Sequence, residues 1–260
     1  MADEQGFTPP LAYYDDEFLK SPEARSVRIL SEYLGPLRKF RRENIRDTIV
    51  MFGSARIQEE GPLARYYHEC RELARRITEW NDSITSSARR FVVATGGGPG
   101  IMEAANRGAH DAGGKSIGLN IALPFEQTPN PYITPELNLE FGYFFLRKFW
   151  FAYPAKALIV FPGGFGTMDE LFEILTLAQT KKLDNRIVVL LYGTPFWEEV
   201  FNFKALVKYG LISPEDLDIF QSADDVDSAF KILSDGLTRL YLTPVEEFEP
   251  TPAIAHTRNK

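Results

Sequence analysis

The sequence predicts an α/β fold of the Rossmann-like type, a doubly wound parallel sheet flanked by helices on both faces. Short, continuous apolar runs alternate along the chain with longer segments that carry apolar residues at helical spacing. Several of the apolar runs end in glycine-rich turns that open the next helical segment. Strands that are apolar throughout and are separated by helices pair in parallel and are covered on both faces. These observations favour a single domain with an N-terminal helical extension.

The expected elements follow an N-terminal arm. Residues 1–20 are rich in proline, tyrosine and acids and show no clear periodicity, whereas Pro22 and Glu23 begin a helix that runs to about residue 40. We expect strands at residues 48–52, 91–94, 116–121, 137–141, 157–161 and 187–191, and helices at residues 63–80, 99–112, 143–153, 167–181, 196–209 and 226–240. The arm and first helix occupy residues 1–45, the Rossmann-like domain residues 46–243, and a proline-containing tail residues 244–260.

The composition is that of an ordinary globular protein, with 44% hydrophobic and 25% charged residues. No apolar run approaches the roughly 18 residues needed to span a bilayer, and the acidic N-terminus lacks the features of a secretory signal. We therefore expect a cytoplasmic protein without a membrane partner. The formal net charge of −7 argues against nucleic acid as a partner. The local basic run of Arg38, Lys39, Arg41, Arg42 and Arg46 is interpreted as a solvated helix face.

The cysteine and the histidines indicate no further site chemistry. Cys70 lies in a helical pattern and is expected to be a buried, inert thiol. His68 is two positions away and points to another face of that helix, so a Cys–His nucleophile is not supported. His68, His110 and His256 have no metal-ligand spacing, and we expect no metal site.

Two strand-to-helix junctions share the pattern Gly-Gly-x-Gly-x-Met-acid. One reads GGPGIME at residues 97–103, and the other reads GGFGTMD at residues 163–169. Glycines at the end of a strand let the backbone approach a ligand, and the free N–H groups of the next helix favour an anion. Because ligands of open parallel sheets bind at the carboxyl ends of the strands, the loops predict a phosphate site. The alternative is that the glycines only make tight turns.

Other glycine motifs do not fit. A dinucleotide fingerprint that starts at Gly96 needs a third glycine at position 101, which is isoleucine. The GKS at residues 114–116 resembles the end of a P-loop, but the first glycine of that motif falls on Ala109 and the segment precedes a strand. The sequence has no Gly-x-Ser-x-Gly nucleophile elbow.

The segment PGGFGTMDE at residues 162–170 resembles the PGGxGTxxE signature of the LONELY GUY (LOG) family. These proteins are cytokinin riboside 5′-monophosphate phosphoribohydrolases, often labelled lysine decarboxylases. Gly53-Ser54, residues 96–109 and residues 144–148 agree as well, and the similarity covers residues 47–240. The resemblance implies a Rossmann-like fold, a homodimer or larger homo-oligomer and no cofactor. It also implies hydrolysis of the N-glycosidic bond of a nucleoside 5′-monophosphate, AMP or an N6-modified AMP, to a free base and ribose 5-phosphate.

The resemblance further implies roles for individual residues. Glu170 matches the essential glutamate of the family and Arg147 its essential arginine. A carboxylate stabilises the positive charge that builds on the sugar or activates water. A guanidinium pairs with that carboxylate, binds phosphate or assists the departing base. The other expected substrate contacts are the phosphate loop with the Thr167 hydroxyl (Gly163, Gly164, Phe165, Gly166, Thr167), the opposite wall (Gly53, Ser54), the ribose or phosphate side (Gly97, Gly98, Gly100), apolar contacts (Met102, Phe144, Phe145) and two secondary candidates (Lys148, Glu173).

Each of these interpretations has an alternative. Thr167-x-x-Glu170 is also the pattern of a capping box, in which the glutamate returns a hydrogen bond to the helix N-cap. Arg147 and Lys148 alone also fit a solvated helix face. The alternative function is a non-catalytic protein that binds or carries a nucleotide or molybdenum cofactor, which has no chemical need of a Glu170–Arg147 pair. Lysine decarboxylation is rejected because no lysine has a recognisable pyridoxal-phosphate context. The short members of the family begin almost at the first strand, whereas this chain carries about 45 residues before it.

Overall fold

The computed structural model describes residues 10–85, 90–123, 128–183 and 187–243. Within these ranges the strands form one all-parallel, seven-stranded sheet in the order β4-β3-β2-β1-β5-β6-β7. The strands are β1 (Thr48–Phe52), β2 (Val92–Thr95), β3 (Ser116–Ile121), β4 (Asn138–Phe141), β5 (Ala155–Val160), β6 (Val188–Tyr192) and β7 (Phe220–Ala223). Because the order runs outward from β1 to β4 on one side and from β5 to β7 on the other, the sheet is doubly wound. The predicted fold class is confirmed.

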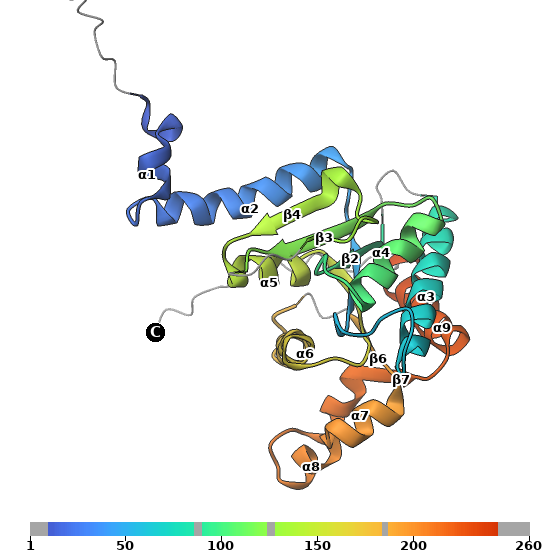
Figure 1. Ribbon diagram of the computed structural model, residues 1–260. Helices are drawn as coiled ribbons and strands as arrows, with labels where there is room; N and C mark the ends of the chain where they lie inside the picture. The colour runs from blue at the N-terminus through green and yellow to red at the C-terminus, as the bar shows by residue number, and fades with distance from the viewer. Residues whose placement is uncertain (1–9, 86–89, 124–127, 184–186, 244–260) are drawn as a thin grey trace, which may run out of the picture.

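Helices cover both faces of the sheet (Figure 1). The helices on one face are α3 (Ala64–Asp82), α4 (Ile101–Asp111) and α9 (Val226–Leu237), which is followed by a short π-helical turn (Thr238–Leu242). Those on the other face are α2 (Arg25–Arg42), α5 (Phe144–Ala152), α6 (Phe165–Gln179) and α7 (Thr194–Val200). Strands β1, β2 and β6 are buried along their whole length, which explains their continuous apolar sequences. Among the described helices, none has both the length and the apolar character required to cross a membrane.

The reversal of strand order lies between β1 and β5, which are neighbours in the sheet. The chain leaves β1 toward β2 on one side and leaves β5 toward β6 on the other. The loops that follow these two strands therefore diverge, and a crevice opens outside their carboxyl ends. This topological switch point is where open α/β sheets bind their ligands.

Most expected elements lie within a few residues of the predicted bounds. The segment expected as one helix over residues 196–209 consists instead of α7 and α8 (Phe203–Lys208). The chain is extended at Phe201, and the Asn202 side chain then caps α8 by accepting a hydrogen bond from the Ala205 N–H at 3.0 Å. The sequence does not predict β7, because Gln221 and Ser222 are exposed and leave this edge strand with little apolar signal.

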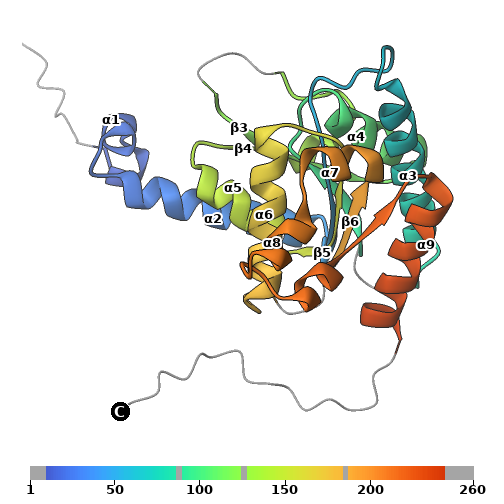
Figure 2. The ribbon, with the colours of Figure 1, turned by 90° about the horizontal axis from the view of Figure 1, so that it is seen from below.

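The N-terminal extension projects from the domain. It contains α1 (Asp16–Lys20), a helix unexpected in the arm, whose N-cap Asp15 accepts hydrogen bonds from the N–H groups of Glu17 and Phe18. Of α2, only Pro36 and Phe40 are buried. Figures 1 and 2 both show α1 and the first half of α2 standing away from the sheet. The first part of the arm (residues 1–9) and the expected tail (residues 244–260) lie outside the described residues.

Candidate active site

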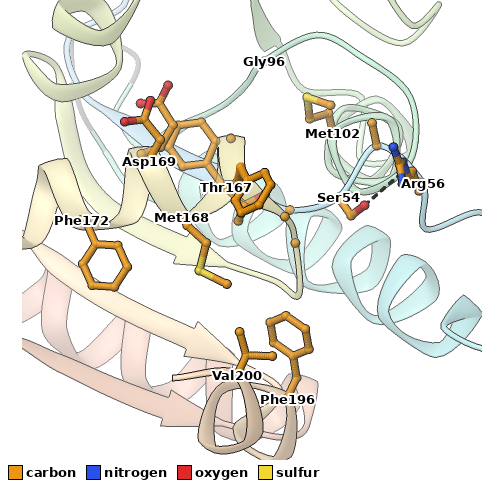
Figure 3. A pocket seen from close by; sticks show the side chains of 18 of the residues that line it. Ser54, Arg56, Gly96, Met102, Thr167, Met168, Asp169, Phe172, Phe196 and Val200 are labelled. Atoms are coloured by element: carbon orange, nitrogen blue, oxygen red, sulfur yellow. Dashed lines mark hydrogen bonds between the residues drawn. The ribbon is translucent and has the colours of Figure 1, made fainter. Parts of the chain in front are cut away.

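A cavity of about 980 Å³ lies at the carboxyl ends of β1 and β5, at the switch point of the sheet. Its walls come from the loop after β1, the loop between β5 and α6, and parts of α4, α5, α6 and α7 (Figure 3). Its polar side chains include Ser54, Arg147, Thr167 and Glu170, and much of the remaining lining is glycine or apolar. A concave, mostly apolar site with a few convergent polar groups is typical of small-molecule binding.

The loop between β5 and α6 leads into an uncapped helix N-terminus. The N-cap of α6 is Gly164, so no side chain caps the helix, and the Met168 N–H makes an intrahelical hydrogen bond to the Gly164 carbonyl at 3.0 Å. The N–H groups of Phe165, Gly166 and Thr167 precede this bond and have no intrahelical acceptor. A Cβ built on Gly164 or Gly166 meets no atom within 4 Å, so both glycines face open space. Free N–H groups at a helix N-terminus, with room for close approach, make an anion site.

Glu170 is a buried carboxyl group on α6, only 7% exposed. Because Gly164 is the N-cap, Thr167 already lies inside the helix, and the two residues do not form the capping box that their spacing allows. Among the described residues, the Glu170 carboxylate has no hydrogen-bond or ion-pair partner. Burial raises the pKa of Glu170 to about 7, although the positive charges of Arg147 and Lys148 lower it. A group with such a pKa exchanges protons near neutral pH, as general acid–base chemistry requires.

Arg147 projects from α5 into the same cavity and is held from three sides. Its Nε donates a hydrogen bond to the Leu119 carbonyl of β3 at 2.7 Å, and its Cζ lies 5.1 Å from the centre of the Phe151 ring. A Cβ built on Gly96 would lie 2.6 Å from Arg147 Nη2, so the guanidinium needs a glycine there. Burial lowers the pKa of Arg147 and the charge of Glu170 raises it, yet the two side chains form no ion pair within 4.0 Å.

The secondary candidates Lys148 and Glu173 do not line the cavity. Lys148 Nζ lies 2.8 Å from Asp169 Oδ2 and 3.2 Å from Glu173 Oε2. These contacts join α5, which carries Arg147, to α6, which carries Glu170. These ion pairs therefore hold α5 and α6 next to each other.

Gly53 and Ser54 line the cavity, as does the loop before α6. The Ser54 N–H donates to the Pro162 carbonyl at 3.0 Å, and the Ser54 carbonyl accepts from the Ile101 N–H at 3.2 Å. These bonds tie the loops after β1 and β5 to the start of α4. The exposed Arg56 also lines the cavity, and its N–H donates to Ser54 Oγ at 3.1 Å. Sequence reasoning missed this arginine, whose available signal is a cation two residues after Gly-Ser.

The second glycine loop differs from the first although their sequences match. Gly97, Gly98 and Gly100 do not line the cavity, whereas Gly96 and Met102 do. The carbonyls of Gly97 and Gly98 each accept a hydrogen bond from Asn130 Nδ2 at 3.1 Å. Gly97 has a φ of +76° and Gly100 a φ of +70°, a left-handed conformation that glycine adopts without strain. The Gly97 N–H donates to Thr95 Oγ1 at 3.0 Å and the Ile101 N–H donates to the Ser54 carbonyl at 3.2 Å, so neither of these N–H groups is free for a ligand.

Apolar side chains line the part of the cavity beside α7. They include Phe172 of α6, Phe196 and Val200 of α7, and Phe201 (Figure 3). Phe144 of α5 also lines the cavity, whereas the expected Phe145 does not. Sequence reasoning missed the residues of α7, because helical periodicity does not tell which face of a helix meets a site. This surface suits a planar, weakly polar group.

The N-terminal extension contacts the helix that carries Arg147. Glu32 of α2 accepts hydrogen bonds from the N–H groups of Gly142 at 2.8 Å and Tyr143 at 3.1 Å, at the start of α5. Arg28 Nε donates to the Tyr143 hydroxyl at 3.3 Å. Glu32 thus supplies the carboxylate that a helix N-terminus favours, and it fixes the beginning of α5.

Fold and site together define a doubly wound α/β protein with an uncapped helix N-terminus and a buried carboxyl group at its switch point. A family model described as "Possible lysine decarboxylase" matches residues 102–233, just over half of the chain. The chain belongs to this family, which includes the LOG proteins.

The similar curated proteins come from plants. The chain is 30% identical to the probable cytokinin riboside 5′-monophosphate phosphoribohydrolase LOGL5 of Oryza sativa subsp. japonica, over 60% of this chain and 58% of that protein. It is 31% identical to the phosphoribohydrolase LOG of the same organism, over 63% and 62% of the two chains. It is 29% identical to LOG3 of Arabidopsis thaliana, over 54% and 65%. The alignments with the two rice proteins span 58% and 62% of their length, less than two thirds.

Two solved structures are similar to this chain, and the first shows the same fold. The X-ray structure of TM1055 has a TM-score of 0.51 and 20% identity, and covers 73% of this chain and 99% of that one. A molybdenum cofactor carrier protein from Chlamydomonas reinhardtii has a TM-score of 0.49 and 21% identity, over 74% and 99% of the two chains.

Proposed function

We propose that the chain hydrolyses the N-glycosidic bond of a nucleoside 5′-monophosphate, AMP or an N6-modified AMP, to a free base and ribose 5-phosphate. The observation that carries this proposal is Glu170. It is a buried carboxyl group with a pKa raised to about 7, without a structural partner, beside an uncapped helix N-terminus. Burying such a group without a partner lowers the free energy of unfolding. Groups of this kind are found at sites where they take part in chemistry. The names of the similar LOG proteins support the same reaction class.

In this proposal each part of the substrate has its own place in the cavity. The 5′-phosphate binds the N–H groups at the start of α6, where Gly164 and Gly166 leave room for it. Glu170 lies one turn along the same helix, roughly 5 Å further at a rise of 1.5 Å per residue, so the ribose lies beside its carboxyl group. The base then reaches the apolar surface that includes Phe196 and Val200.

The reaction needs one water and one proton acceptor. As the bond between the ribose C1′ and the base nitrogen lengthens, positive charge builds on the sugar, and ionised Glu170 stabilises it. Water oxygen forms the new bond to C1′, and its proton passes to Glu170. The electron pair of the broken bond leaves with the base, which then takes up a proton. Arg147 keeps its charge at all working pH values and stabilises the negative charge of the phosphate or the departing base.

Lysine decarboxylation finds no support in the site. Pyridoxal phosphate attaches to a lysine side chain. Among the described residues that line the cavity, none is lysine, and Lys148 is bound to Asp169 and Glu173 outside it.

The test follows release of free base from AMP and from an N6-modified AMP by chromatography. Adenosine, which lacks the phosphate, is the matched substrate control. Glu170→Gln is compared with wild type and with Glu199→Gln, which changes an exposed glutamate of α7. We expect wild type and Glu199→Gln to release base from the monophosphates and not from adenosine, and Glu170→Gln to be slower by at least about a hundredfold.

Two results contradict the proposal. Equal release by wild type and Glu170→Gln removes the role of Glu170. Binding of the monophosphates without release of any base, measured by calorimetry on the same preparation, favours a protein that holds a nucleotide or phospho-cofactor without turnover.

A further inference from the structure

The N-terminal extension presents apolar side chains that no part of the described chain covers. Six of the large ones, between 36% and 74% exposed, are Tyr13, Tyr14, Phe18, Val27, Leu30 and Leu34. Leu11 is also 58% exposed, and Tyr33 is 38% exposed although its ring contacts those of Phe149 and Trp150. Val27, Leu30 and Leu34 follow the i, i+3, i+7 spacing of one helix face, so they form a stripe along α2. The opposite side of α2 packs on the domain through Pro36 and Phe40.

This apolar face is larger than scattered exposure explains. An aromatic side chain has about 150–250 Å² of surface. The largest apolar patch on a typical monomer is about 300–600 Å². The exposed areas of these six side chains together reach that range, although the extension is small. Each partner of a standard interface contributes about 800 Å². The domain contacts α2 through residues outside this stripe, including Arg28 and Glu32, while α1 and the first half of α2 stand away from the sheet in both views (Figures 1 and 2).

The two ends of the extension carry opposite charges. At the outer end, four acidic residues accompany one lysine: Asp15, Asp16, Glu17, Glu23 and Lys20. At the inner end of α2, four basic residues are exposed: Arg38, Lys39, Arg41 and Arg42. Arg38 and Arg41 continue the stripe of Val27, Leu30 and Leu34, being four and seven residues beyond Leu34.

Arg25 and Arg28, at the beginning of α2, reduce the negative charge of the outer end but do not reverse it. Arg28 Nη1 donates to the carbonyls of Leu19 at 2.7 Å and Ser21 at 2.6 Å, and its Nε donates to the Tyr143 hydroxyl. Arg25 lies 5.9 Å from the centre of the Tyr143 ring. Both arginines are thus engaged by this chain's own groups.

We propose that this face binds the same face of a second copy of this chain, with the two α2 helices antiparallel across a two-fold axis near Leu30. A two-fold interface must be complementary to itself. Arg38 lies eight residues after Leu30 and Glu23 seven residues before it, so an antiparallel pair sets Arg38 opposite Glu23 of the partner subunit. In the same way Arg41 meets the acidic α1. The apolar stripes meet in the middle, and opposite charges fix the register at both ends.

A second copy fits this face better than other classes of partner. The formal net charge of −7 and the acidic outer end disfavour nucleic acid and an anionic membrane surface. The inference does not rest on the proposed activity, and its test reads mass rather than turnover.

The test measures the mass of the full chain in solution by light scattering after size exclusion, over a range of protein concentrations. The first variant is Leu30→Glu with Leu34→Glu, and its control is Leu211→Glu, which changes a side chain that is 69% exposed outside the extension. We expect the double variant to have half the mass of wild type and the control to have the full mass. A wild type that is monomeric throughout, or a double variant of unchanged mass, overturns the proposal.

Charge reversal tests the antiparallel order with surface substitutions that leave the core intact. Arg38→Glu with Arg41→Glu is expected to halve the mass at physiological salt. Adding Glu17→Arg and Glu23→Arg in the same chain restores the opposite-charge pairs and the wild-type mass. Loss of mass in the first variant without restoration in the second overturns the antiparallel arrangement. Circular dichroism of each variant confirms that it is folded.

Discussion

Replacing Glu170 with glutamine is expected to stabilise the folded protein above neutral pH. Burial raises the pKa of Glu170 from 4.5 to about 7 in the folded state. Its ionisation is therefore harder in the folded than in the unfolded chain, at about 1.4 kcal/mol for each pKa unit, which amounts to roughly 3 kcal/mol. The sign follows from a raised pKa. The stability contributed by protonated Glu170 is complete below pH 4.5 and is lost as the pH rises to about 7.

Chemical denaturation of wild type and Glu170→Gln between pH 4.5 and pH 8.5 measures this difference. Glutamine is neutral at every pH, so the variant lacks the loss. We expect the free energy of unfolding of the variant to exceed that of wild type by an amount that grows up to about pH 7 and is constant above it, at up to about 3 kcal/mol. Glu199→Gln, at an exposed position on α7, is the matched control and should follow wild type.

The activity of the wild type should depend on the same ionisation of Glu170. The ionised form should be the active one, whereas the protonated form is the more stable one. Because ionised Glu170 accepts the proton of water in the proposed reaction, kcat/KM should fall about tenfold for each pH unit below about 7. If the difference in free energy of unfolding between Glu170→Gln and wild type does not change between pH 5 and pH 8, the reasoning is refuted. Such a result means that Glu170 has the same pKa in the folded protein as in the unfolded chain.

Three further substitutions test the surroundings of the site. Gly166→Ala should leave the free energy of unfolding unchanged or raise it by up to about 1 kcal/mol, because alanine has the higher helix propensity. KM for AMP should rise, because the new methyl group enters the open space before α6. An unchanged KM places the phosphate elsewhere. Gly96→Ala should lower kcat, since its Cβ would lie 2.6 Å from Arg147 Nη2, and steady-state kinetics with wild-type values contradict this. Glu32→Ala should lower kcat, and it should lower the free energy of unfolding by about 1–3 kcal/mol. Glu32→Gln should restore part of both losses. A loss of stability with full kcat limits Glu32 to a structural role.

The sequence predicts the fold well because the signals of a parallel sheet are local. The strands expected at residues 48–52 and 116–121 have the predicted bounds, since each is a short apolar run that both faces of the sheet bury. The edge strand β7 escapes prediction because an edge strand with exposed polar residues has little local signal. The break between α7 and α8 depends on the conformation at Phe201, which helical periodicity does not reveal.

The site is less accessible to sequence reasoning, because it depends on which parts of the chain meet. The two glycine loops are nearly identical in pattern, yet Asn130, more than thirty residues beyond Gly97, binds the carbonyls of one of them, whereas the other lines the cavity. The apolar lining from α7 and the exposed Arg56 likewise enter the cavity only through tertiary packing. The contact of Glu32 with the start of α5 joins residues 110 positions apart, and no local pattern announces it.

The position of Arg147 relative to Glu170 explains how the site keeps a reactive carboxyl group. A direct ion pair would lower the pKa of Glu170 and hold it ionised, whereas here the pKa of Glu170 is raised to about 7 because burial outweighs the attraction of Arg147. The contacts that set this spacing lie outside the pair itself. The Leu119 carbonyl holds Arg147 Nε at 2.7 Å, and the ion pairs of Lys148 join α5 to α6. Two groups of opposite charge therefore face one cavity without forming an ion pair, and in the proposed reaction each can act on the substrate separately.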